Sequence, residues 1–124
     1  MELMIESFDT YEETSAATTE TRVSQRPVDL VHLARYTLGD EETEREVLAL
    51  FRTQSQSLLR RLKDNPDQVS RQRTANTLEA SARGIGAWRV AVAADLVQGQ
   101  AGVRILEDRI EEANRFIGAL LGTD

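Results

Sequence analysis

The most restrictive feature of the sequence is the spacing of its apolar residues near the C-terminal end. They recur at intervals of four, three, four and three residues: Leu106, Ile110, Ala113, Ile117 and Leu120. Because an α-helix turns by about 100° per residue, this spacing places all five on one side of a helix. Such a stripe is typical of a helix that packs lengthwise against other helices. We therefore predict a helix over residues 103–121 that forms part of a helical bundle.

Two longer helices are expected in the middle of the chain. Asp40 suits the N-cap of a helix that runs to about Lys63, and Pro66 suits the first position of the next one, with Asp67 in its first turn. The second helix is expected to end at a turn over 84–86. The apolar stripes are Val47, Leu48, Phe51, Ser55, Leu58, Leu59 and Leu62 in the first helix, and Val69, Ala75, Leu78, Ala82 and Ile85 in the second. Both stripes follow the helical period.

Two shorter helices complete the prediction. One covers residues 28–37, and the other begins at Trp88 and ends near Val97, before a turn over residues 99–102. No segment shows the apolar and polar alternation of a β-strand. The sequence therefore predicts an all-α fold, an antiparallel four-helix bundle with the short N-terminal helix across one end.

Charge and composition divide the chain into two parts. Residues 1–26 carry six acidic residues and two arginines without a sustained period, which indicates an acidic, disordered N-terminal tail. Residues 27–124 are expected to form the helical domain. Four apolar residues of the tail, Met4, Ile5, Phe8 and Tyr11, leave a second interpretation open, a docking segment that folds on a partner.

Composition also argues against several classes of function. The net charge is −6 without a basic stripe, which disfavours nucleic-acid binding. No apolar run approaches the roughly 20 residues of a membrane helix, and the first residues are acidic where a signal peptide is basic. With no cysteine and a single histidine, His32, we expect neither a metal site nor a cofactor. These features favour a cytoplasmic protein. Arg60, Arg61 and Lys63 suit the C-terminal end of a helix dipole, so we interpret them as a solvated helix end in preference to a docking patch.

Residues 75–87 read Ala-Asn-Thr-Leu-Glu-Ala-Ser-Ala-Arg-Gly-Ile-Gly-Ala. This segment resembles the signature of the histidine-containing phosphotransfer (HPt) domain, which runs roughly Ala-His-x-Leu-Lys-Gly-Ser-Ala-Arg-x-Ile-Gly-Ala. The framework residues agree, but Asn76 stands in place of the phosphoacceptor histidine, Glu79 in place of a lysine and Ala80 in place of a glycine. Residues 29–42 also look like the first helix and acidic turn that precede the bundle in this family, so the resemblance covers roughly residues 28–121.

The resemblance implies a phosphoryl-transfer scaffold from which the chemistry has been lost. In the family, an exposed histidine takes a phosphoryl group from the aspartate of a receiver domain, beside a cation that holds the phosphoryl oxygens. The amide nitrogen of Asn76 is not a nucleophile at neutral pH, and Glu79 adds negative charge. We therefore expect no enzymatic activity and no catalytic residue, with Asn76 a degenerate phosphoacceptor position. By the helical period, Asn76, Glu79, Ala80 and Arg83 form a candidate partner-binding face, in which Arg83 serves either partner recognition or an exposed salt bridge.

Three hypotheses for function follow from the sequence. The first is a non-catalytic HPt-like signalling module that binds a receiver domain or a histidine kinase and modulates a two-component phosphorelay. The second is a genuine phosphotransfer protein in which Asn76 is a local or engineered substitution, although three changes within five residues count against it. The third is a helical structural or dimerising protein. The sequence leaves open the identity of the partner, the sign of regulation and the oligomeric state.

Overall fold

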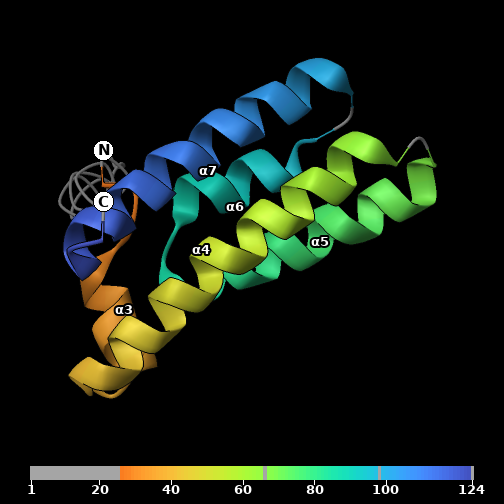
Figure 1. Cartoon of the computed structure of the whole chain (residues 1–124). Coiled ribbons are helices and arrows are strands. Elements are labelled where there is room, and N and C mark those ends of the chain that lie inside the picture. Colours follow the sequence, from red (N-terminus) through yellow and green to blue (C-terminus); the bar gives the residue numbers. More distant parts are fainter. Residues whose placement is uncertain (1–25, 66, 98, 124) are drawn as a thin grey trace, which may run out of the picture.

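The computed structural model describes residues 26–65, 67–97 and 99–123, and this part of the chain consists of helices joined by short connections (Figure 1). The helices are α3 (Leu30–Tyr36), α4 (Glu41–Asp64), α5 (Gln68–Ile85), α6 (Trp88–Asp95) and α7 (Gln100–Leu121). No strand occurs among the described residues. The predicted all-α class is confirmed. The predicted tail lies outside the described residues except for Arg26.

The four helices α4 to α7 pack around one core. Helix α4 packs against α5 and α7, helix α6 packs against the same two helices, and α3 packs against α5. In Figure 1, α4 and α5 lie side by side and run in opposite directions. The core contains buried apolar side chains from all five helices, among them Leu33, Leu48, Phe51, Leu62, Leu78, Val90, Leu106, Ile110 and Ile117. Burial of these side chains is the main favourable term in the stability of the fold.

Helix α4 begins and ends as its sequence predicts. The Asp40 carboxylate accepts a hydrogen bond from the Thr43 amide at 3.1 Å and so caps the first turn. Glu41, Glu42 and Glu44 lie in that turn, whereas Arg61 and Lys63 lie in the last one, which complements the helix dipole at both ends. Asn65 forms the C-cap in an extended conformation. This local chemistry fixes the length of the longest helix.

A polar pair interrupts the apolar seam between α4 and α7. Ser55 is fully buried, and its hydroxyl accepts a hydrogen bond from Asn114 Nδ2 at 3.1 Å while donating one to the Arg52 carbonyl at 3.2 Å. These bonds explain why a serine is accommodated within the stripe of α4, since a buried hydroxyl without partners is costly.

Asp29 connects α3 to the turn between α5 and α6. Its Oδ1 caps α3 by accepting hydrogen bonds from the amides of Val31 and His32, at 3.1 and 3.2 Å. Its Oδ2 accepts a hydrogen bond from Trp88 Nε1 at 3.0 Å, and its own amide donates to the Gly86 carbonyl at 2.9 Å. The Trp88 ring also meets the His32 ring edge to face, with centroids 4.8 Å apart. Burial raises the pKa of Asp29, but the hydrogen bonds from Trp88 and the two amides outweigh it, so the pKa lies below its ordinary value.

The close approach of Asp29 requires glycine at position 86. Gly86 ends α5 in the left-handed conformation, with φ 83°. A Cβ at this position would lie 3.0 Å from both the Cβ and the carbonyl oxygen of Asp29. The predicted turn over 84–86 is therefore partly wrong, because Gly84 remains helical and faces the Tyr36 ring, and only Gly86 ends the helix.

Helix α5 begins later than predicted. Asp67 is the N-cap rather than a residue of the first turn, because its carboxylate accepts hydrogen bonds from the amide and hydroxyl of Ser70. Pro66 consequently precedes the helix. Val69 was expected in the buried stripe but is 62% exposed. The physical reason is its spacing of six residues from Ala75, which places the two side chains on different faces of the helix.

The other boundaries also differ from the predictions. Helix α7 begins at Gln100, so the predicted turn over 99–102 is shorter. Gly102 lies inside the helix, where a Cβ would come 3.3 Å from the Cα of Val97. Leu120 was expected in the seam but is 40% exposed, while Gly118 beside it is buried. The helices predicted over 28–37 and 88–97 are shorter than expected, although Val28 and Val97 are still buried beside them.

The Gly86→Ala substitution is expected to destabilise the fold by about 2–3 kcal/mol, because alanine meets both the left-handed backbone penalty and the contact with Asp29. Gly39→Ala is the matched control, since Gly39 has φ 76° and nothing within 4 Å of its added Cβ. This control is expected to cost about 1 kcal/mol. Urea unfolding measures both values, and equal losses would refute the close packing at Gly86.

The Asp29→Asn substitution is expected to cost about 1–3 kcal/mol, because the new amide keeps the α3 cap but turns an N–H group toward Trp88 Nε1. Asp67→Asn is the control, since an asparagine oxygen can still accept the hydrogen bonds from Ser70.

The lowered pKa of Asp29 means that its contribution to stability is present above pH about 3.8 and is lost as the pH falls through the folded-state value. Unfolding curves measured from pH 6 down to 2.5 should therefore show a weaker acid dependence in Asp29→Asn, and an unchanged dependence would refute the assignment.

Candidate functional site

The face of α5 predicted to bind a partner lies on the surface. Asn76, Ala80 and Arg83 are exposed, and Glu79 is half-buried. The apolar framework residues of the same helix point the other way, and Ala75, Leu78, Ala82 and Ile85 are all buried in the core. The segment thus separates its two sets of side chains as the helical period requires. We call Asn76, Glu79, Ala80 and Arg83 the α5 face.

The side chains of the α5 face are paired with one another and with a neighbour on the same helix. Arg83 Nε donates a hydrogen bond to Glu79 Oε2 at 3.0 Å, and Arg83 Nη2 lies 3.0 Å from the same oxygen. Gln72 Nε2 donates to Asn76 Oδ1 at 3.2 Å. Both pairs span four residues, the spacing at which helical side chains are neighbours. The charges of Glu79 and Arg83 therefore balance each other on this face.

The side chains of the α5 face differ from those that phosphoryl transfer to a histidine requires. Asn76 has no nucleophilic nitrogen, and the one arginine of the face is held by a carboxylate. His32, the single histidine, lies on α3 against Trp88. Within the described ranges, no three His, Cys, Asp or Glu side chains lie close enough to hold a metal ion. The α5 face presents an amide, a methyl group and an ion pair.

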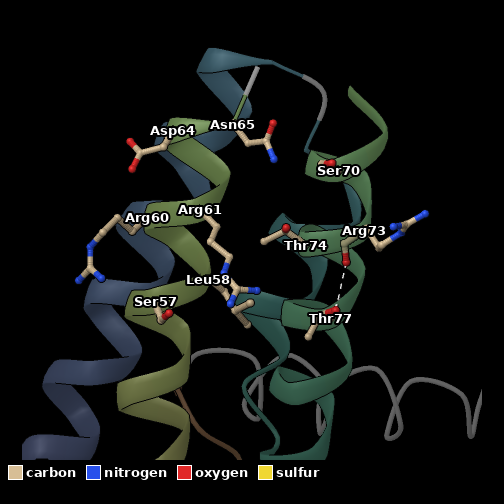
Figure 2. A pocket seen from close by; sticks show the side chains of 10 residues that line it. All are labelled: Ser57, Leu58, Arg60, Arg61, Asp64, Asn65, Ser70, Arg73, Thr74 and Thr77. Atoms are coloured by element: carbon tan, nitrogen blue, oxygen red, sulfur yellow. Dashed lines mark hydrogen bonds between the residues drawn. The ribbon is translucent and has the colours of Figure 1, made fainter. Parts of the chain in front are cut away.

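An open groove of about 680 Å³ lies beside the α5 face, between the C-terminal part of α4 and the N-terminal part of α5. Figure 2 shows the Arg61 side chain extending between the two helices, whereas Arg60 and Arg73 point outward on either side. The remaining lining is mainly polar and includes Ser57, Asp64, Asn65, Ser70, Thr74 and Thr77, with Leu58 as its apolar part. Asp64 is the only carboxylate among these lining residues. We call this surface the arginine groove.

The sequence did not predict the arginine groove, because a solvated helix end was preferred to a docking patch at Arg60 and Arg61 and neither was connected with Arg73. A signal was nevertheless present. Ser57 and Arg61 are four residues apart on one helix, while Ser70, Thr74 and Thr77 are four and three apart on the next, so each set shares one side of its helix. Only the lateral packing of α4 against α5 brings the two sets together.

The chain matches no family model, no curated protein and no solved structure. Of the helices that the structure describes, none combines the length and the apolar character needed to span a membrane. The resemblance of residues 75–87 to the HPt signature is therefore supported by the residues of that segment alone.

Proposed function

We propose that this protein is a non-catalytic HPt-like signalling module, which binds a receiver domain or a histidine kinase and modulates a two-component phosphorelay without accepting a phosphoryl group. The observation that carries the proposal is the placement of the α5 face. The positions that differ from the HPt signature, Asn76, Glu79 and Ala80, lie on the surface or at its edge, whereas most of the framework residues that agree with it are buried. A partner would therefore meet the substituted positions on a retained scaffold.

The proposal also covers the arrangement of the helices and the cellular location of the protein. We propose that α4 to α7 form an antiparallel four-helix bundle of the HPt type, with α3 across one end. The packing of α4 and α6 against both α5 and α7, and of α3 against α5, supports this arrangement. A phosphorelay partner would place the protein in the cytoplasm. The pairing of Glu79 with Arg83 supports the absence of phosphotransfer, because it neutralises the arginine that would otherwise stabilise a transferred phosphoryl group.

Incubation with a receiver domain phosphorylated on its aspartate, in the presence of magnesium, is expected to leave no stable phosphoryl label on this chain. The reason is the missing imidazole nucleophile at position 76. The measurement is transfer of a radiolabelled phosphoryl group. Acid-labile, base-stable label on the chain, at His32 or elsewhere, would contradict the proposal.

A triple variant is expected to gain the phosphoryl label that the natural sequence lacks. Combining Asn76→His, Glu79→Lys and Ala80→Gly restores the nucleophile, adds a cation and releases Arg83 from its ion pair. We expect this variant to acquire label from a receiver domain that binds the chain. The single variant Asn76→His serves as control and is expected to acquire less, because Glu79 still holds Arg83.

The Ala80→Arg substitution is expected to weaken binding of a receiver domain encoded beside this gene by about 2 kcal/mol, roughly thirtyfold, because the long side chain blocks close approach to α5. Ala80 is exposed, so the helical fold should remain intact. The matched control is Ala119→Arg, an exposed alanine on α7, which is not among the main packing partners of α5. Calorimetric titration measures both affinities, and undiminished binding by Ala80→Arg would exclude contact through the α5 face.

A further inference from the structure

The arginine groove has an excess of positive charge on an acidic protein. Arg60, Arg61 and Arg73 contribute three guanidinium groups, against the single carboxylate of Asp64. No ion pair within the described part of the chain joins any of these three arginines to a carboxylate. Nearby, Lys63 pairs with Glu107 on α7 at 2.8 Å, so that lysine is already neutralised. The hydrogen bonds from Ser70 and, to a smaller extent, the charge of Arg73 hold the pKa of Asp67 below its ordinary value, so a carboxylate partly balances Arg73. The positive charge that lies between the two helices is therefore that of Arg61, flanked by Arg60.

The chemistry of the groove selects an acidic ligand that also has apolar groups. A guanidinium is a donor-only group whose planar fork matches a carboxylate. The Arg61 side chain lies between the two helices, and Leu58 provides an apolar surface beside it (Figure 2). A segment that alternates carboxylates with apolar side chains would satisfy both features.

Such a segment is present at the start of this chain. Residues 1–11 read MELMIESFDTY and combine three acids with apolar side chains at short intervals. The acids are Glu2, Glu6 and Asp9, and the apolar residues include Met4, Ile5, Phe8 and Tyr11. The sign of the charge and the apolar character are both complementary to the arginine groove. We propose that the arginine groove binds the chain's own N-terminal acidic segment, residues 1–11.

The connecting chain is long enough for this contact. Residue 26 precedes α3, which is followed directly by the N-terminal end of α4, whereas the groove is lined by the C-terminal part of α4. The 24 residues of α4 span about 36 Å at 1.5 Å per residue. The fourteen residues 12–25 reach up to about 46 Å at 3.3 Å per residue. A tether of this length holds the segment near the groove at an effective concentration on the order of millimolar, so individually weak ion pairs suffice.

The absence of cysteine from the chain allows a direct test on the full-length protein. A nitroxide attached to Thr10→Cys is expected to broaden the amide signals of Ser70, Thr74 and Thr77 in the spectrum of the isotope-labelled chain. Raising the salt from about 0.1 M to about 1 M shortens the screening length from about 10 to about 3 Å and should remove most of the broadening. Mixing spin-labelled, unenriched chain with isotope-labelled chain that lacks the nitroxide should broaden these signals little, since the contact is within one chain.

Charge reversal provides the second arm. Arg61→Glu in the Thr10→Cys background is expected to abolish the broadening, whereas Arg115→Glu, at an exposed arginine of α7, should leave it unchanged. The amide spectrum of each variant reports separately that the helices remain folded. Broadening that is absent from the groove, insensitive to salt or retained in Arg61→Glu would overturn the proposal. If inorganic phosphate shifts the groove amides while the nitroxide at position 10 does not broaden them, the groove binds a different anion and the proposal is likewise wrong.

Discussion

The contact of Asp29 with the turn at Gly86 and Trp88 is the interaction on which the rest of the described structure depends. One carboxylate caps α3 and holds the Trp88 indole, while the adjoining amide bonds to the Gly86 carbonyl. The end of α5 and the start of α6 are therefore set by a residue almost sixty positions earlier in the chain. This contact fixes how α5 ends, whereas the buried stripe of Ala75, Leu78, Ala82 and Ile85 sets which side of the helix faces the core.

Helix boundaries could be predicted where local side chains set them. The predictions were wrong where tertiary contacts set the boundary. The long helix α4 was predicted almost to the residue, since Asp40 caps its start and Asn65 ends it. The start of α7 was misjudged, because Gly102 appeared to be a turn residue until its contact with the backbone of Val97 was known. The bond between Asp29 and Trp88 has no local signature at all, and the full bundle arrangement remains a prediction.

The two candidate surfaces differ in how far the sequence reveals them. The α5 face lies on a single helix, so the helical period alone places Asn76, Glu79, Ala80 and Arg83 together, and the spacing of four between the charged pair is visible in the sequence. The arginine groove is formed by two helices, and its existence depends on how far α4 is rotated against α5. That rotation is a property of core packing, which involves the shapes of many side chains at once.

The distribution of charge along α4 has a consequence for how other molecules first meet this protein. Most of its acids lie near the N-terminal end and most of its bases lie toward the C-terminal end, although Arg45 and Asp64 are exceptions; Glu42 and Lys63 are about 30 Å apart at 1.5 Å per residue. The side-chain charges of α4 exert a torque on a charged molecule during its approach, over a range of about 10 Å at 0.1 M salt, and the backbone dipole of the helix opposes part of it. The α5 face balances its own charges and exerts little such torque. The charges of α4 thus contribute to the orientation of an encounter before any contact with α5 is made.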